Sequence, residues 1–190
     1  MARKIKSDDM IKRRALSSIN FGVVQIPDET HLLHLQFRRY AGCPFCNLHL
    51  HSLKSRYLEL EAAGIREVVV FHSTRDRLLE KQPSMPFPII ADPDKSLYAE
   101  FGVERGWRGV LNPRVLIQTL RAGLLKQRIV VPAIGDSPIG LPGDFLIAPD
   151  GRVLACKYGD HAYDQWSVDE LLALASKANI IPLRRTRLSS

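Results

Sequence analysis

The sequence predicts an α/β fold in which helices flank a central mixed sheet. Short apolar runs alternate three times with segments of helical periodicity, and a hairpin pattern and a last helix pattern follow. The chain has 190 residues, of which 45% are hydrophobic, so it can bury one sizeable core. No run of about twenty apolar residues occurs, and the sequence therefore predicts no transmembrane helix.

The first half of the chain supplies alternating strands and helices. Apolar runs predict strands at 32–37, 68–71 and 89–90, and helical spacing predicts helices at 46–63, 73–80 and 92–101. Gly64 ends the first helix, and Ser73 with Asp76 is suited to cap the second. Pro93 fits the first turn of the third helix. Right-handed crossovers place these three strands in parallel, with helices on both faces.

The second half of the chain ends in a hairpin and a helix. Residues 144–147 and 153–157 flank a Pro-Asp-Gly turn, which predicts an antiparallel pair. Ser167 and Glu170 form a capping box for the last helix. Between these halves, the pattern predicts a helix at 112–125 and a loop at 135–140.

Three segments follow from these patterns. Residues 1–30 are expected to form an N-terminal arm or small hairpin, residues 31–180 the main domain, and residues 181–190 a basic tail. The net charge is +7, from 27 Lys and Arg against 20 Asp and Glu, but much of the excess lies at the two ends. Basic tails are usually solvated, so we expect no nucleic-acid partner. No apolar segment follows the charged N-terminus, so we expect no secretion signal and a cytoplasmic protein.

The cysteine pattern points to redox chemistry. Cys43 and Cys46 have C-x-x-C spacing at the predicted switch from strand to helix. The positive end of a helix dipole favours the reactive thiolate, and Arg38 and Arg39 just upstream would add positive charge. Two intervening residues, Pro44 and Phe45, allow the sulfurs to reach disulfide distance. The sequence therefore predicts a pair that cycles between dithiol and disulfide.

Other residues offer weaker candidates. The pair could be half of a zinc site with His49 or His51, but no second C-x-x-C or spaced histidine pair follows. Cys156 lies on the second hairpin strand, as a buried inert cysteine or as a resolving thiol. His161 belongs to a polar and aromatic loop that could line a groove or pack against the last helix.

The element order is that of the thioredoxin-like fold with one extra strand–helix unit before the hairpin. Three stretches then resemble peroxiredoxin-like members of the alkyl hydroperoxide reductase/thiol-specific antioxidant family. They are 34–46 (HLQFRRYAGCPFC), 87–103 (FPIIAD through LYAEFGV) and 141–153 (LPGDFLI through DGRV). The second stretch resembles the strand–helix insertion that peroxiredoxins have and thioredoxins lack. The resemblance thus implies a thioredoxin-like fold with that insertion.

The resemblance also implies roles for residues around the cysteines. Peroxiredoxins carry a P-x-x-x-T-x-x-C motif, in which Cys46 would be the peroxidatic cysteine, Cys43 replaces the threonine and Arg39 the proline. This analogy makes Cys46 the attacking sulfur, whereas the thioredoxin analogy makes it Cys43. Pro142 either resembles the cis-proline that faces the C-x-x-C in thioredoxin-like proteins or is an ordinary loop proline.

The activity expected from the resemblance is thiol-dependent reduction of a peroxide or a disulfide. A disulfide reductase without peroxidase activity, or a zinc-stabilised or inactive binding module, is the alternative. The electron donor would be a thiol reductant such as a thioredoxin or glutathione system. No flavin or nucleotide motif occurs, so no bound cofactor is expected. Homodimers are common in the family, so we expect a homodimer as one option.

Overall fold

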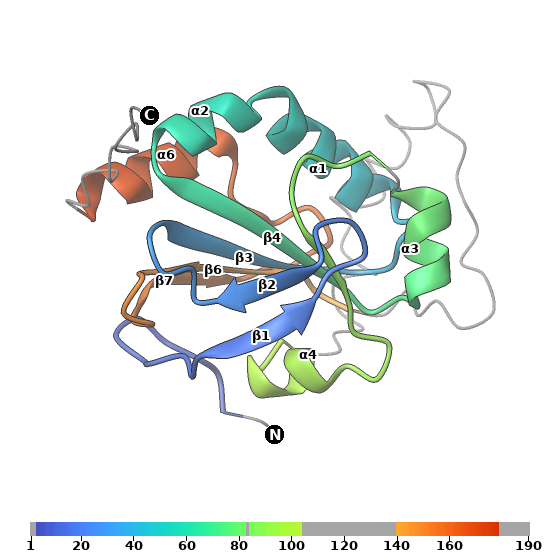
Figure 1. The fold of residues 1–190 in the computed structure, drawn as a ribbon, viewed down its shortest axis with the longest axis horizontal. Coiled ribbons are helices and arrows are strands. Elements are labelled where there is room, and N and C mark those ends of the chain that lie inside the picture. Colours follow the sequence, from blue (N-terminus) through green and yellow to red (C-terminus); the bar gives the residue numbers. More distant parts are fainter. Residues whose placement is uncertain (1–2, 83, 104–139, 179–190) are drawn as a thin grey trace, which may run out of the picture.

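A five-stranded mixed sheet forms the centre of the molecule (Figure 1). The computed structural model describes residues 3–82, 84–103 and 140–178. The strands, in the order in which they pair, are β5 (Ile89–Ala91), β4 (Ile65–Phe71), β3 (Leu32–Arg38), β6 (Gly143–Ile147) and β7 (Val153–Tyr158). β3, β4 and β5 are parallel, and β6 runs antiparallel to its neighbours β3 and β7. The predicted α/β class and mixed sheet are confirmed.

Helices cover both faces of the sheet (Figure 1). One face packs against α1 (Pro44–Ser55), α2 (Tyr57–Ala62), α3 (Arg75–Lys81) and α6 (Val168–Lys177). The other face packs against α4 (Ser96–Glu100) and a hairpin made of β1 (Arg14–Ser17) and β2 (Val23–Ile26). Because successive side chains of a strand point to opposite faces, β3 contributes Leu33, Leu35 and Phe37 to this second core.

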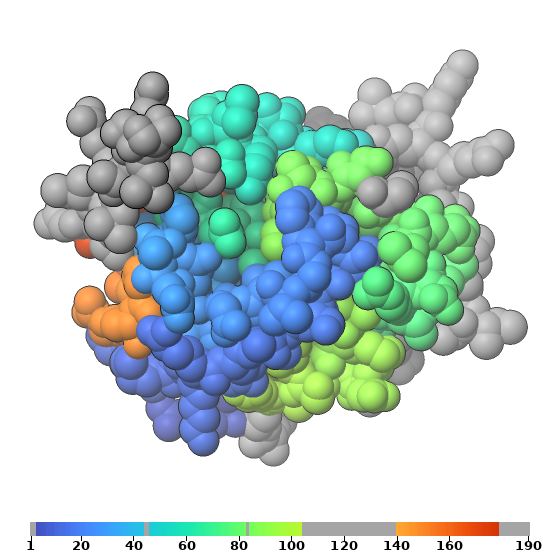
Figure 2. Space-filling view, in the orientation of Figure 1, coloured from blue at the N-terminus to red at the C-terminus, as the bar shows by residue number. Residues whose placement is uncertain are grey.

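The N-terminal hairpin is attached to the sheet by both packing and hydrogen bonds. Val24 and Ile26 are buried in the core beneath it. The main-chain N–H of Ile19 donates to Ile89 O over 2.8 Å, and Arg14 forms an ion pair with Glu100 of α4. In Figure 2 this segment, drawn in blue, spreads over the front of the molecule beside α4. The hairpin is therefore part of the packed domain.

Several predicted element boundaries differ from those observed. The helix expected at 46–63 is divided into α1 and α2 at Arg56, whose φ of −116° is not helical. The N-cap of α3 is Thr74, one residue after the predicted Ser73. The helix expected from 92 begins at Ser96, because the Asp92 carboxylate instead accepts hydrogen bonds from the N–H groups of the first turn. The predicted helix at 112–125 lies outside the described residues.

The capping box of the last helix is confirmed. Ser167 is the N-cap of α6, its hydroxyl accepts from the Glu170 N–H, and the Glu170 carboxylate accepts from the Ser167 N–H. This reciprocal pair satisfies two N–H groups that the first turn leaves without helical partners. The helix then buries Val168, Leu171 and Ala175 against the sheet.

Candidate active site

The two cysteines lie where β3 passes into α1. The main-chain N–H of Cys43 donates to Tyr40 O over 3.0 Å, which closes a tight turn after the strand. Cys43 then takes the N-cap position, with Pro44 opening the first turn of α1. Cys46 follows in the same turn, and the N–H of Asn47 donates to Cys43 O over 3.0 Å. The strand end and the helix start thus fix both cysteines in one turn of backbone.

Neighbouring elements brace this turn from the outside. The N–H of Ala41 donates to Ser73 Oγ over 3.0 Å, and Gln82 Nε2 donates to Ala41 O over 3.1 Å. The same amide also donates to Asn47 Oδ1 of α1. Since Ser73 follows β4 and Gln82 follows α3, two other elements hold the cysteine turn in place.

Both sulfurs are buried and close together. Cys43 and Cys46 have an exposed fraction of 0%, and their side chains share a hydrogen bond. Burial raises the pKa of the Cys46 thiol, and Cys43 raises it further. The main-chain N–H and the guanidinium of Arg39 act in the opposite direction on this pKa. Both cysteines are present as free thiols.

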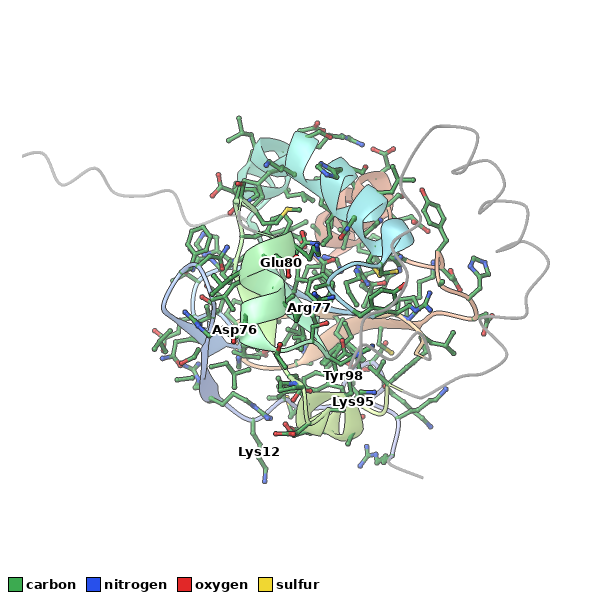
Figure 3. The ribbon with its side chains drawn as sticks, turned by 90° about the vertical axis from the view of Figure 1, so that its right-hand side faces the viewer. Lys12, Asp76, Arg77, Glu80, Lys95 and Tyr98 are labelled. Atoms are coloured by element: carbon green, nitrogen blue, oxygen red, sulfur yellow. The ribbon has the colours of Figure 1, made fainter. Side chains whose placement is uncertain are left out.

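Tyr98 approaches this site from α4, and Figure 3 shows its position above that helix. Its hydroxyl donates to the carbonyls of Arg38 and Val70, the latter over 3.0 Å. Burial raises the pKa of Tyr98, and the charge of Cys46 raises it further. His72 packs edge-on against the Tyr98 ring at 5.6 Å between centroids. A buried tyrosine and histidine therefore lie at the same edge of the sheet as the cysteines.

The structure places the other predicted site residues as follows. Arg39 contacts the pair through its N–H, whereas Arg38 is buried in the sheet and forms an ion pair with Asp144 at 2.7 Å. Phe45 lies in the first turn of α1. His161 lies between β7 and α6, where its Nδ1 accepts a hydrogen bond from the Tyr163 N–H over 3.3 Å.

The structure also shows the surroundings of Pro142 and Cys156. In the described residues only the Ile26–Pro27 peptide bond is cis, so the cis-proline alternative for Pro142 is wrong. Pro142 instead directly precedes β6, and its carbonyl accepts from the Gly159 N–H over 2.9 Å. Cys156 is half-buried on β7, where its thiol donates to Ile5 O and burial raises its pKa.

A set of buried polar side chains was not predicted from the sequence. His34, Gln36 and Arg38 alternate along β3 and have wholly buried side chains, as do Glu67 on β4 and Asp144 on β6. The visible signal was their position in the run LLHLQFR, where polar residues interrupt a buried strand at every second place. Tyr98 and His72 carried no such signal, since tertiary packing alone brings them to the cysteines.

Two negative findings apply to the described part of the chain. Among residues 3–82, 84–103 and 140–178, no group of three or more His, Cys, Asp or Glu side chains is arranged to hold a metal ion. None of the helices described is both long and apolar enough to cross a membrane.

Comparison with known proteins agrees with this geometry. A sequence profile of the AhpC/TSA antioxidant enzyme family matches residues 52–161, which is more than half of the chain. The chain belongs to the AhpC/TSA antioxidant enzyme family. The matched stretch begins after Cys43 and Cys46, so the cysteine pair is identified by its own position in the fold. Family membership makes the chain a peroxiredoxin-like protein with thiol redox function.

Solved structures show the same fold. Peroxidoxin BcpB from Mycobacterium tuberculosis is 16% identical, with a TM-score of 0.67 over 91% of this chain and 97% of that chain. The 2-Cys peroxiredoxin of Plasmodium vivax is 12% identical, with a TM-score of 0.65 over 90% and 81%. A peroxiredoxin 6 of Arenicola marina is 13% identical, with a TM-score of 0.64 over 92% and 73%. A search of curated proteins gives no match.

Proposed function

We propose that the chain reduces a peroxide by cycling Cys43 and Cys46 between dithiol and disulfide. The observation that carries this proposal is the hydrogen-bonded contact between two wholly buried sulfurs at the start of α1. A peroxide is small, so a slight opening of the site admits it. A disulfide of a folded protein needs an attacking sulfur at the surface. The burial of the pair in its reduced state therefore favours the small oxidant.

The proposed cycle has two steps. One thiolate attacks a peroxide oxygen, the O–O bond breaks, the alcohol leaves with a proton, and the sulfur becomes a sulfenic acid. The second thiol then attacks this sulfur, the S–S bond forms, and the hydroxyl leaves with a proton as water. The two cysteines are oxidised and the peroxide is reduced to alcohol and water. An external thiol reductant, such as a thioredoxin or glutathione system, returns the disulfide to the dithiol.

Cys43 is the better candidate for the attacking sulfur. Burial and Cys43 together raise the pKa of Cys46, which keeps Cys46 in the thiol form. Cys43 holds the N-cap, where a helix dipole favours an anion. This assignment follows the thioredoxin analogy and leaves Cys46 as the resolving thiol.

A second function is thiol–disulfide exchange without peroxidase activity. It is favoured by Cys43 itself, because this cysteine stands where peroxiredoxins carry the threonine of their motif. A cysteine at this place forms a vicinal pair that a disulfide substrate can oxidise. A zinc-stabilised or inactive binding module would leave both thiols unused in any redox cycle.

Stopped-flow oxidation by hydrogen peroxide separates these functions. The expected result is oxidation much faster than that of free cysteine, followed by disulfide formation. In Cys46→Ser the first oxidation should persist and stop at a sulfenic acid, whereas Cys43→Ser should lose it. Oxidation no faster than free cysteine, together with rapid reduction of a model disulfide, would support the exchange function. Metal retained through purification would support the zinc-stabilised module.

We further propose a reducing cytoplasmic setting, which suits a C-x-x-C pair that is regenerated by a cellular thiol system. Size-exclusion chromatography with light scattering tests whether the chain forms the homodimer common in its family. We propose no nucleic-acid partner and no bound cofactor for this activity.

A further inference from the structure

A wholly buried charge network lies in the layer between the sheet and α1. Its members are His34, Gln36 and Arg38 of β3, Glu67 of β4 and Asp144 of β6. In the register of the sheet, Glu67 stands beside His34 and Asp144 stands beside Gln36. Strands buried on both faces usually carry apolar residues throughout, so these five side chains are an exception within the core.

Hydrogen bonds connect the network across three strands. His34 contacts Glu67 Oε2 at 2.7 Å through Nδ1 and Asp144 Oδ1 at 3.1 Å through Nε2. Arg38 donates to Asp144 Oδ1 at 2.7 Å and to Gln36 Oε1 at 2.7 Å. The contacts with both carboxylates raise the pKa of His34 to about 9. The Asp144 carboxylate contacts both the His34 ring and the Arg38 guanidinium.

This network adjoins the helix turn that carries the cysteines. Cys43, Cys46 and Trp166 belong to one buried cluster, and the Trp166 ring packs on His34 at 5.8 Å between centroids. The main-chain N–H of Trp166 donates to Asp144 Oδ2 over 3.4 Å. Arg38 also directly precedes Arg39, whose N–H contacts the Cys46 sulfur. Through Trp166 the network therefore borders the buried cluster that holds the two thiols.

His49 shows that the field of the network reaches α1. It follows Cys46 by three residues, so the two side chains lie on the same face of the helix. Burial, together with the charges of Arg38, His34 and Lys157, lowers the pKa of His49 to about 3, although Asp144 opposes this effect. Its Nε2 atom is buried and has no hydrogen-bond partner among the described residues. The positive charges of Arg38, His34 and Lys157 thus act on the face of α1 that carries Cys46.

A buried network of this kind is not required for a stable core. Taking ions out of water costs free energy that their mutual attraction often fails to offset, and well-packed apolar replacements are frequently as stable. The network also leaves Arg38 Nε and Glu67 Oε1 without partners among the described residues. This cost is a reason to look for a role of these charges beyond packing.

We propose that the Arg38–Asp144 pair sets the electrostatic potential at the cysteine pair and so tunes how readily Cys43 and Cys46 ionise. Asp144 offsets the buried positive charge of Arg38, and removal of either member leaves the charge of the other uncompensated. Both are positioning residues, since they act through the field and touch no substrate. Besides this network, Arg39 and Tyr98 face the thiols directly, and His49 lies on the same face of α1 as Cys46. These three residues remain unchanged in the test. The inference rests on the proposed function only in taking this pair as the reactive one.

The test compares two opposite substitutions in the full chain. Reduced protein is alkylated with iodoacetamide across a pH series, and mass spectrometry reads the peptide with Cys43 and Cys46 apart from that with Cys156. Asp144→Asn should move the pH midpoint for alkylation of the pair down by roughly half a unit to one unit, and Arg38→Met should move it up by as much. Cys156 lies across the sheet and should keep its midpoint in both variants.

The proposal requires the alkylation midpoints of Asp144→Asn and Arg38→Met to move in opposite directions. A purely structural role would change alkylation rates at every pH, or shift both variants alike, and either result would overturn the proposal. Glu67→Gln removes an equal charge from a residue that contacts His34 and Gln36, and a shift as large as that of Asp144→Asn would also contradict the specific role of the Arg38 pair.

Two further controls keep the result decisive. If Arg38→Met fails to fold, His34→Gln removes the other cation with a side chain that still donates, and it should shift the midpoint upward. If Asp144→Asn fails to fold, the upward shift of either cation variant decides alone. Alkylation needs no oxidant. The midpoint shifts therefore test this proposal separately from the question whether peroxide forms the proposed disulfide.

Discussion

At the scale of single residues, His34 shows how one side chain can join three strands. Its two ring nitrogens contact carboxylates on β4 and β6, on either side of its own strand. Each contact favours the imidazolium, and together they outweigh the burial that opposes it. The charge on this ring is therefore linked to folding.

This link predicts a loss of stability in alkaline solution. The folded-state pKa of His34 is about 9, above the value of 6.5 expected without these contacts. Its contribution is thus complete below about pH 6.5 and is lost as the pH rises through about 9. The loss is on the order of 3 kcal/mol. Urea unfolding at pH 6.5 and pH 9 measures it, and His34→Gln should show a shallower dependence; equal slopes in both proteins would disprove the link.

At the scale of elements, the sequence indicated those whose cause is local. Ser167 with Glu170 predicted the last helix because its capping contacts join residues three positions apart. The apolar run of β4 and the turn before β7 could also be predicted from the sequence, because their causes are local too. The start of α4 was misplaced, because the Asp92 side chain competes with the helix for the N–H groups.

The candidate site likewise combines features with a local cause and features that depend on tertiary packing. The spacing of Cys43 and Cys46 and their place before a helix could be read from the chain. The approach of Tyr98 to Arg38 and the pairing of Arg38 with Asp144 could not be read from the chain. The members of these pairs are separated by 60 and 106 positions in the sequence, so they meet only through tertiary packing. Polar side chains within an apolar strand are the sign that a buried network needs partners elsewhere.

The capping box gives one test at this scale. Ser167→Ala removes the hydroxyl that accepts from the Glu170 N–H and should lower the free energy of unfolding by about 1 kcal/mol. Ser176→Ala, an exposed change near the other end of α6, should change it by less than about 0.5 kcal/mol. Chemical denaturation compares the two, and equal effects would show that the cap is not what stabilises α6.

The turn between β6 and β7 gives another test at the scale of elements. Gly151 has a φ of +96°, and an added Cβ would lie 2.8 Å from Ile11 O. Gly151→Ala should therefore cost more than about 1 kcal/mol, from both strain and the clash. Gly22→Ala is the matched control, with a φ of +67° and nothing within 4 Å of the added atom. Thermal unfolding should show the larger loss at Gly151, and the reverse order would refute the clash.

At the scale of the whole molecule, the N-terminal hairpin completes the second core. Ile11, Val24 and Ile26 are buried in the same cluster as Leu33 and Phe145 of the sheet. The sheet face beneath the hairpin is apolar, and loss of this cover would expose it to water.

Deletion of residues 1–30 should consequently lower the melting temperature markedly and increase binding of a hydrophobic dye. Phe21→Ser is the control, since this hairpin side chain is about half exposed and its loss should leave the melting temperature nearly unchanged. A truncated chain that melts at the wild-type temperature would show that the hairpin is a separable arm.

The central claim is that Cys43 and Cys46 form one redox pair. Mass spectrometry of the full chain after one equivalent of hydrogen peroxide, with free thiols blocked, tests it most directly. The account predicts a loss of two hydrogens on the peptide that contains both cysteines, reversed by a thiol reductant, with Cys156 still reduced. Unchanged thiols, or a disulfide that joins either cysteine to Cys156, would contradict it.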